Sequence, residues 1–379
     1  MDFELNKTQQ LFQQMIREFS EKEVKPLAAE IDEQERFPVE TVEKMAKLGI
    51  LGIPVPVAYG GAGGDNIMYS IAIEELSRVC GTTGVIVSAH TSLCVVPILE
   101  FGSEEQRQKY LPKLCRGEWL GAFGLTEPNA GTDASSQQTM AVPDGDEYIL
   151  NGSKIFITNA GYAQVYIIFA MTDKSVGVKG ITAFIVEAGT PGFSVGKKEL
   201  KLGIRGSATC ELIFENCRIP KSNILGKIGG GFSIAMKTLD GGRIGIASQA
   251  LGIAQGAMDE TIKYAKERKQ FGKSISAFQN TQFQMAELHT KVEASRLLVR
   301  SAALKKDSGQ PYSAEAAMAK LFAAETSMEV TTKAVQFHGG YGYTREYPVE
   351  RMMRDAKITE IYEGTSEVQK MVIAAQIFK

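Results

Sequence analysis

Glu363, in the segment IYEGTSEVQ (361–369) near the end of the chain, is a carboxylate that could act as a base. A carboxylate kept from water can remove a weakly acidic proton, because burial raises its pKa toward neutrality. The residues that follow have an ordinary structural role as well. Thr365 or Ser366 is a suitable N-cap for a final helix, with Glu367 in its first turn. That capping role does not exclude catalysis by Glu363.

Two further segments combine hydroxyl groups with small or aromatic residues. LTEPNAGTDASS (125–136) includes Thr126 and Thr132, and Pro128 stiffens it. Such a loop offers hydrogen-bond donors and a close backbone approach to a planar polar ligand. In IFITN (155–159) an aromatic residue stands beside a hydroxyl. Composition alone favours an ordinary loop of a β domain for the first segment and ordinary strand alternation for the second.

Charged residues gather in two segments of the last third of the chain. LDGGR (239–243) contains Asp240 and Arg243, three residues apart at the expected start of a helix. ERKQFGK (267–273) has the basic residue Arg268 shortly before an aromatic residue. Taken alone, these are a surface ion pair, worth a few tenths of a kcal/mol, and a solvated face.

Several motifs for phosphate, dinucleotide or metal binding are incomplete. The run Gly60–Gly64 lacks a preceding strand and a following Lys-Ser/Thr pair, and Glu267 stands where a phosphate loop ending at Ser274 needs its first glycine. No GxGxxG follows an expected strand, so a Rossmann domain has no support. The five cysteines form no CxxC pair and the three histidines lie far apart, so no metal site is expected.

The composition limits the classes of partner. A chain of 379 residues with 44% hydrophobic content is expected to form two or three domains. With a net charge of -2 and no basic stripe, no nucleic-acid partner is expected. The polar start MDFELNKTQQLF is not a secretory signal, and no segment reaches roughly 18 uninterrupted apolar residues, so no membrane association is expected. The scattered cysteines fit a reduced, cytoplasmic compartment.

The elements that must position these residues fall into three regions. Residues 1–117 show apolar residues at helical spacing, residues 118–225 are short β-rich runs between turn residues, and residues 226–379 are helical again. We therefore expect a multidomain α+β protein with an N-terminal helical domain, a middle β domain and a C-terminal four-helix bundle. Asn151-Gly152 is expected to turn a β-hairpin, and Ser313 to N-cap a helix.

Six segments, in the same order along essentially the whole chain, resemble the acyl-CoA dehydrogenase family. Each is moderately specific, and chance similarity in all six is very improbable. The detail is most similar to the short-chain (butyryl-CoA) dehydrogenases of anaerobic bacteria. The six strings are LTEPNAGTDAS, KIFITN, LDGGRIGIA, ERKQFGK, QFHGGYGYTREYPVERMMRD and IYEGTSEVQ.

The resemblance implies FAD as the cofactor. The segment around Leu125 matches the wall that hydrogen-bonds the flavin ring, and Phe156, where many relatives have Trp, matches the next flavin-contacting strand. Arg268 and its neighbours match residues that reach FAD, some across a dimer interface. The implied FAD contacts are Phe123, Leu125, Thr126, Phe156, Thr158, Arg268, Phe271, Gln279, Gln336, Gly339, Gly340, Thr365 and Glu367.

The resemblance also implies that Glu363 is the catalytic base. Some relatives that act on long or branched substrates carry their base two residues after the Asp of LDGGR. Here that residue is Gly242, so Glu363 is the family-type base that remains, which favours the straight-chain branch. The implied acyl-CoA contacts are Thr132, where relatives commonly have Ser, together with Asp240, Arg243, Tyr362 and Gly364.

The activity implied is α,β-dehydrogenation of a short-chain acyl-CoA, butyryl-CoA to crotonyl-CoA or the reverse. Electrons would be exchanged with an electron-transferring flavoprotein, and the family implies a homotetramer built as a dimer of dimers. Two alternatives are an acyl-CoA oxidase that uses O2 and a helical scaffold that has lost the flavin. The presence of Glu363, Thr126, Thr158 and Arg268 argues against the scaffold.

Overall fold

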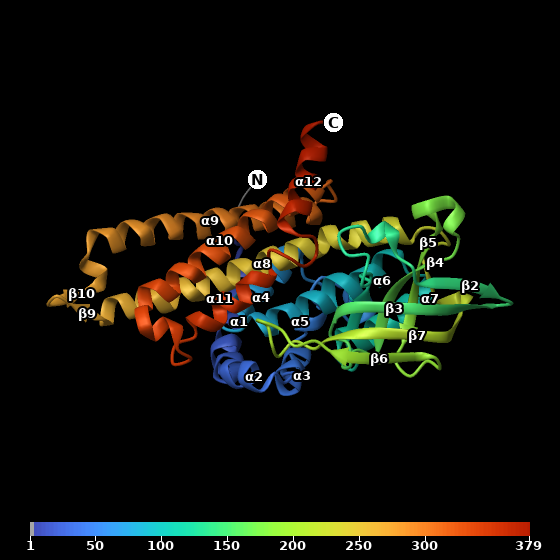
Figure 1. Ribbon diagram of the computed structural model, residues 1–379, viewed down its shortest axis with the longest axis horizontal. Helices are drawn as coiled ribbons and strands as arrows, with labels where there is room; N and C mark the ends of the chain where they lie inside the picture. Colours follow the sequence, from blue (N-terminus) through green and yellow to red (C-terminus); the bar gives the residue numbers. More distant parts are fainter. Residues whose placement is uncertain (1–3) are drawn as a thin grey trace.

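The computed structural model describes residues 4–379, and it has the expected order of a helical region, a β region and a second helical region. In Figure 1 the large sheet occupies one end of an elongated molecule, while the longest helix, α8, runs from that sheet toward the opposite end, where β9 and β10 lie. The three-domain α+β architecture predicted from the sequence is therefore confirmed.

Within residues 4–117 the first region contains seven α-helices, and helices α4 and α5 pack against α8 in the centre of the molecule. Glycines on α8 permit this packing, since a Cβ at Gly252 would overlap the carbonyl oxygen of Glu74. The helices are α1 Lys7–Phe19, α2 Ala28–Gln34, α3 Val39–Lys47, α4 Asn66–Ser77, α5 Gly81–His90, α6 Val96–Phe101 and α7 Glu104–Cys115.

Helices α5 and α6 are joined by a π-helical segment, η5 (Thr91–Val95). The continuous stretch Gly81–Phe101 is long and apolar enough to cross a membrane by length and composition, but 83% of its most apolar window is buried inside the protein. Burial between α8 and the sheet accounts for this apolar composition, because a core helix has no face that must meet water.

The middle region is an eight-stranded sheet with the strand order β6-β7-β3-β2-β4-β5-β8, in which β1 pairs parallel to β4. Strand β4 is buried along its whole length, which is why its sequence, VYIIFAM, is almost entirely apolar. The strands are β1 Gly121–Gly124, β2 Met140–Asp144, β3 Glu147–Thr158, β4 Val165–Met171, β5 Ile181–Glu187, β6 Phe193–Lys198, β7 Thr209–Pro220 and β8 Ile224–Leu225.

The last region contains three long helices and two shorter ones, and α10 packs against α8, α9, α11 and α12. A two-stranded ribbon joins α8 to α9. These elements are α8 Gly231–Glu267, β9 Lys269–Gln270, β10 Lys273–Ser274, α9 Gln279–Asp307, α10 Ser313–His338, α11 Val349–Ile358 and α12 Ser366–Ile377.

Local capping signals explain where several helices begin. Asp65 caps α4 by accepting from Met68 N at 2.7 Å, and Ser103 and Gln106 form a capping box at α7. Thr365 caps α12 by accepting from Val368 N at 3.3 Å. Of the two residues proposed as caps for the final helix, Thr365 is therefore the one that performs this role.

Three local predictions were wrong. Asn151-Gly152 lies inside the single strand β3, where Gly152 forms a bulge because a Cβ there would lie 2.6 Å from Thr139 Oγ1. The hairpin turn instead falls at residues 145–146, between β2 and β3. Ser313 is the first residue of α10 rather than its cap, and its hydroxyl donates to Asp240. Asp240 itself lies well inside α8, which begins at Gly231.

Candidate active site

Glu363 lies in a tight turn between α11 and α12. Its backbone is left-handed, with φ 51°, and Gly364 follows with φ 93°. A non-glycine residue rarely adopts this conformation unless the surroundings hold it there. The holding contacts come from Gln369, whose Nε2 donates to Gly364 O at 2.8 Å and to Glu363 O at 3.3 Å. Lys320 Nζ also donates to Gly364 O, at 2.7 Å.

The Glu363 carboxylate lies directly over Gly242 on α8. A Cβ at Gly242 would overlap Glu363 Oε2 and would stand 3.0 Å from Leu93 Cδ2. Glycine is therefore the residue type that leaves room for this carboxylate. Although part of the Glu363 residue is exposed, its Oε2 is inaccessible to solvent and accepts no hydrogen bond from any of residues 4–379.

Burial controls the electrostatics of Glu363. It raises the pKa of the carboxyl to about 7, while the positive charges of Lys320 and Arg243 oppose the increase. At neutral pH both the ionised and the protonated forms of the carboxyl are therefore populated. A carboxylate with a pKa near the working pH combines availability with basic strength, as general base catalysis requires.

Arg243 and Tyr362 surround the base with fixed polar groups. The buried Arg243 guanidinium pairs with Asp240, which also accepts from Ser313, and Arg243 Nε has no partner within the part of the chain that the structure describes. The Tyr362 hydroxyl donates to Gln249. Burial raises the pKa of Tyr362, so this hydroxyl stays protonated.

The two segments expected to contact flavin lie side by side. Ile155 N donates to Thr126 O at 2.9 Å, which joins the 125–136 loop to strand β3. Thr126 and Thr158 are partly exposed, whereas Leu125 is buried. Phe156 has a left-handed φ of 62° and is 60% exposed. Together they form an open wall with an uncovered aromatic ring and backbone groups within reach.

A buried ion pair fixes this wall from behind. Lys154, which is fully buried, donates to Glu127 Oε1 at 2.7 Å, to Gln137 Oε1 at 3.0 Å and to Leu125 O at 3.2 Å. Glu127 in turn accepts from Thr139 N at 3.0 Å. One side chain on β3 thus ties down both ends of the hydroxyl-rich loop.

Segment η5 connects the base to the wall. Leu93 lies against Gly242 and the Glu363 carboxylate, and η5 also packs against strand β1. Just before η5, His90 Nδ1 accepts from Gly121 N at 3.0 Å. Burial lowers the pKa of His90 to about 4, so this imidazole is a neutral structural link. The carboxylate and the wall therefore share one rigid support.

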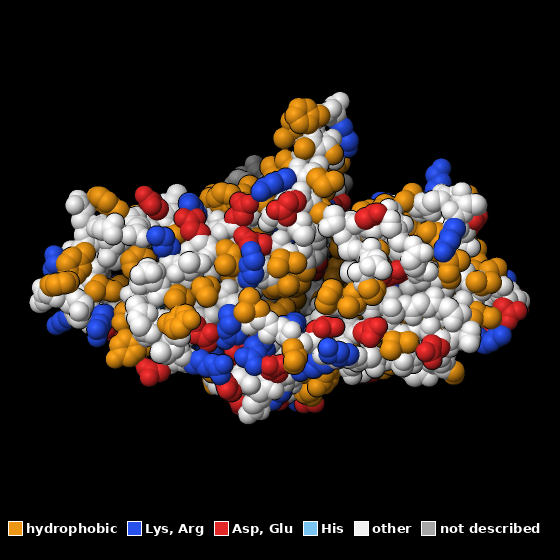
Figure 2. Space-filling model, in the orientation of Figure 1, with side chains coloured by type: hydrophobic (Ala, Val, Ile, Leu, Met, Phe, Trp, Pro, Cys, Tyr) orange, Lys and Arg blue, Asp and Glu red, His pale blue; other side chains and the backbone are white. Residues whose placement is uncertain are grey.

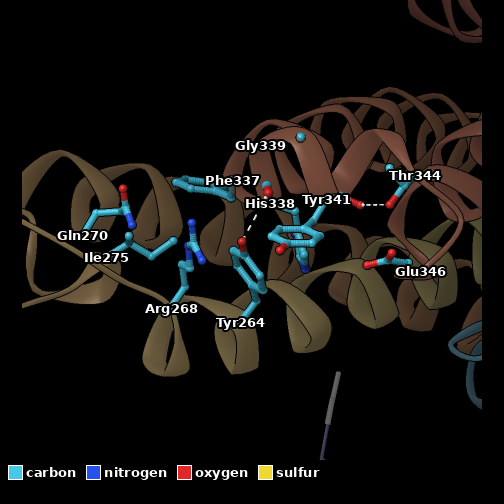
Figure 3. Close-up of a pocket in the computed structure, with 11 residues that line it drawn as sticks. Tyr264, Arg268, Gln270, Ile275, Phe337, His338, Gly339, Tyr341, Thr344 and Glu346 are labelled. Atoms are coloured by element: carbon cyan, nitrogen blue, oxygen red, sulfur yellow. Dashed lines mark hydrogen bonds between the residues drawn. The ribbon is translucent and has the colours of Figure 1, made fainter.

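A second set of expected cofactor residues lies at the other end of the molecule. Arg268 is the C-cap of α8, Phe271 lies in the turn of the β9–β10 ribbon, and Gln279 begins α9, all far from the large sheet (Figure 1). Phe271 is 94% exposed. Gly339 and Gly340 line a pocket of about 440 Å³ together with Arg268 (Figure 3).

That pocket combines aromatic and cationic groups suited to a polar ligand. The Arg268 guanidinium stands 5.9 Å from the ring centroid of Tyr341, and Tyr264 stacks on His338 at 4.2 Å. Figure 3 shows Arg268 and Tyr264 on α8 facing Phe337 and Tyr341 across the pocket. Gln336 is exposed just before this stretch.

Within one chain, the predicted residues therefore form three groups, two that are neighbours and one that is distant. Tyr362, Glu363, Gly364, Arg243 and Asp240 gather around the base, and the wall residues lie across η5 from them. Thr132 is exposed on the loop before β2, and Glu367 is exposed on α12. The ribbon and the pocket at Gly339 are distant from both.

Sequence reasoning missed the residues that hold the site in place. Lys154 and Glu127 stand inside recognised motifs, but no role was assigned to either. Lys320 left a clear signal: it is a lysine on a helix face otherwise lined by Ala316, Ala319 and Ala323. Gln369 carried no comparable signal, because a glutamine on an amphipathic final helix is unremarkable.

The fold and the base-and-wall site define a class of protein that comparison with family models identifies. Residues 6–118 match the acyl-CoA dehydrogenase N-terminal domain, residues 122–217 the middle domain and residues 229–378 the C-terminal domain. The chain belongs to the acyl-CoA dehydrogenase family, whose members are flavoproteins.

Within that family the chain is similar to short-chain members from anaerobic bacteria. It is 64% identical to the short-chain specific acyl-CoA dehydrogenase of Clostridium acetobutylicum over 100% of both chains. The solved butyryl-CoA dehydrogenase of Megasphaera elsdenii is 52% identical with a TM-score of 0.98, and covers 100% of both chains. A chain in the structure of the electron transferring flavoprotein of Acidaminococcus fermentans is 57% identical with a TM-score of 0.99, again over 100% of both.

Proposed function

We propose that this protein is a FAD-dependent dehydrogenase of short-chain acyl-CoA thioesters, converting butyryl-CoA to crotonyl-CoA, with Glu363 as the base that removes the α proton. One observation supports this proposal more strongly than the others. Glu363 Oε2 is buried and accepts no bond from residues 4–379, while Gly242 leaves space beneath it. An unsatisfied buried carboxylate oxygen is costly unless a ligand uses it.

The residues of the wall fit an isoalloxazine ring. Phe156 offers an uncovered aromatic face, and Thr126 and Thr158 offer partly exposed hydroxyls beside it. When bound, FAD supplies the acceptor for the β hydrogen and its electron pair. Phe123, Leu125, Thr365 and Glu367 complete the set that we assign to this cofactor on the base side of the molecule.

The chain itself can polarise the thioester. The backbone N–H of Glu363, in its left-handed turn, donates to no carbonyl or side chain of residues 4–379. A free N–H beside the base can donate to the thioester oxygen and stabilise the enolate that forms as the α proton leaves. Arg243, Asp240, Thr132, Tyr362 and Gly364 would contact the rest of the acyl-CoA.

The space beyond the base is short, which supports a short acyl chain. One turn further along α8, a Cβ at Gly245 would overlap Ser88 Oγ and lie 2.6 Å from the Tyr69 hydroxyl. Another turn on, Gln249 is fully buried, accepts from Tyr362 and donates to Gly81 O at 2.9 Å. Polar side chains thus fill this face of α8 where a longer acyl chain would extend.

A second copy of the chain would complete the cofactor site. Arg268, Phe271, Gln279, Gln336, Gly339 and Gly340 lie too far along the molecule to reach the wall of their own chain (Figure 1). We propose that they contact FAD in a homodimer and that two dimers form a tetramer. Helix α12 projects from the molecule with Met371, Ile377 and Phe378 at least 66% exposed, as an assembly interface would require (Figure 2).

For the electron partner we propose an electron-transferring flavoprotein, in the cytoplasm. The same chemistry run in reverse would reduce crotonyl-CoA. No nucleic acid or membrane enters this proposal, and positive and negative side chains are interspersed over the face in Figure 2. An oxidase that passes electrons to O2 is the competing assignment.

The test is a spectroscopic titration of the purified protein. We expect the absorbance of an oxidised flavin and anaerobic bleaching by butyryl-CoA, with little bleaching by palmitoyl-CoA. Rapid O2 consumption with butyryl-CoA would establish the oxidase instead. A colourless protein that cannot be reconstituted with FAD would contradict the proposal altogether.

A further inference from the structure

Two lysine side chains are fully buried among residues 4–379, Lys154 and Lys320. Burying an ammonium group is costly unless it is paired and hydrogen-bonded, so each calls for a physical reason. Lys154 is explained by its ion pair with Glu127. Lys320, on the face of α10 that packs toward α8 and α12, makes no ion pair with a carboxylate in the described chain.

The single hydrogen bond of Lys320 goes to the turn that carries the base. Its Nζ donates to Gly364 O at 2.7 Å. The same carbonyl accepts from Gln369 Nε2 at 2.8 Å, so a neutral donor already satisfies it. Gln369 also reaches Glu363 O. Holding the turn therefore does not require a charge, and the charge of Lys320 needs another function.

The charged groups that face Glu363 leave Lys320 as the uncompensated cation. From α8 comes Arg243, but its guanidinium is neutralised by Asp240. From α4 comes the neutral Tyr69 hydroxyl, and next to Glu363 stands the neutral Tyr362. Among its acidic neighbours, Glu363 acts most strongly on Lys320, ahead of Glu360 and Glu367. Of the two cations that act on Glu363, Lys320 has the larger effect and Arg243 the smaller.

We propose that Lys320 is a positioning residue for the catalytic base: it holds the Glu363–Gly364 turn through the Gly364 carbonyl and keeps the Glu363 carboxylate ionised through its unpaired charge. The inference rests on the proposed function, since it concerns the same base. Without Lys320, the desolvated carboxyl would hold its proton to higher pH, because only Arg243, which is paired with Asp240, would then oppose the cost of burying the anion. Burial lowers the pKa of Lys320 itself to about 8, so the ammonium persists at neutral pH.

The test is the pH profile of kcat/KM for butyryl-CoA in Lys320→Met, a variant of similar length without charge. Because the base must be ionised to act, losing a nearby cation should move the acidic limb upward by about one pH unit. The loss would then be about tenfold at pH 6 and would shrink as pH rises. Lys320→Gln, which keeps a donor but not the charge, should show the same shift and serves if Lys320→Met does not fold.

Two control variants separate the electrostatic effect of Lys320 from the effect of the hydrogen bonds that hold the Glu363–Gly364 turn. Gln369→Met removes a neutral clamp and should lower activity at every pH without moving the limb. Lys291→Met removes an exposed lysine that pairs with Glu329 and should change neither. An unshifted limb in both Lys320 variants, with wild-type protein active, would overturn this inference alone. Wild-type protein inactive toward every acyl-CoA would instead overturn the proposed function.

Discussion

The wall around Phe156 and the Glu363–Gly364 turn are each held by a fully buried lysine, but the two lysines have different partners. Lys154 meets a carboxylate, two carbonyl-type acceptors and a loop that wraps around it. Lys320 meets one backbone carbonyl. Burial lowers the pKa of both ammonium groups to about 8. The two lysines therefore differ in their hydrogen-bonding partners and not in how deeply they are buried.

That contrast matches what each side must do. The wall has to hold a shape, and an ion pair with matched hydrogen bonds fixes shape while cancelling its own field. The base turn has to hold a shape and keep a desolvated carboxylate reactive. An unpaired cation there extends its field to Glu363. The charge of Lys154 is therefore neutralised by its ion pair and serves the structure. The charge of Lys320 is not paired and acts on Glu363.

Breaking the ion pair between Lys154 and Glu127 should have the largest effect on stability. Lys154→Met leaves the Glu127 carboxylate buried without its cation, and we expect a loss of about 3–5 kcal/mol in the free energy of unfolding. Burial alone would raise the pKa of Glu127, and Lys154 with the backbone donors lowers it on balance. Urea unfolding measures the loss. Lys154→Met/Glu127→Gln should recover most of it, and an equal loss in both variants would contradict this account of the pair.

Filling the space under the base should have the next largest effect. Gly242→Ala forces the Glu363 carboxylate off its position, and a misplacement of about 1 Å can cost about 100-fold in rate. We expect a loss of that order in kcat/KM with butyryl-CoA. Gly241→Ala is the matched control, because the added Cβ meets only side-chain ends, Lys306 Nζ at 3.0 Å and the Tyr312 hydroxyl at 3.8 Å, and not the Glu363 carboxylate. Equal activities in the two variants would mean that Glu363 does not need this space.

The acidity of the base should appear in the wild-type pH profile. Since Glu363 acts as the ionised form and burial raises its pKa to about 7, kcat/KM should fall by about tenfold per unit below that pH. The carboxyl gains its proton as pH decreases, so activity is lost on the acidic side and retained above pH 7. A profile that stays flat from pH 5 to 8 would show that this carboxyl is not the group that titrates.

The smallest effect concerns the helix that follows the base. Thr365→Ala removes the cap of α12 and should lower the free energy of unfolding by about 1 kcal/mol. Ser366→Ala should change it little, because the Ser366 hydroxyl is buried without a partner among residues 4–379. Thermal unfolding of the two variants compares them directly. A greater loss for Ser366→Ala would reverse the capping assignment.

The sequence predicted the parts of this molecule that local pattern determines. Helical spacing, strand composition and the Thr365 cap each depend on residues that are close together in the sequence. The order of the three regions follows from these local features. The Asn151-Gly152 hairpin was wrong because a bulge inside a strand uses the same residue types as a turn, and only the close contact with Thr139 decides between them. The prediction that Ser313 is an N-cap was wrong because its hydroxyl donates to Asp240, which is distant in the sequence.

The holding residues of the site could not be predicted for a related reason. Lys320 and Gly364 are 44 residues apart, and Lys154 and Glu127 are 27 apart, so their pairing depends on the packed fold. A lysine on an alanine-lined helix face indicates that a charged side chain is buried. It does not indicate which group that side chain contacts. The family resemblance, and not local pattern, implied that some of the Arg268 group reach FAD across a dimer interface, and the structure places the β9–β10 ribbon at the far end of the molecule from the large sheet.

The most direct test of the central claim isolates proton removal from electron transfer. Purified protein is incubated anaerobically in D2O with a butyryl-CoA analogue whose β carbon is replaced by sulfur, so that no hydride can leave, and deuterium at the α carbon is followed by mass spectrometry. We expect rapid exchange in wild-type protein and a loss of about 10²–10⁴-fold in Glu363→Gln, with the analogue still bound. Undiminished exchange in that variant would show that another group removes the proton.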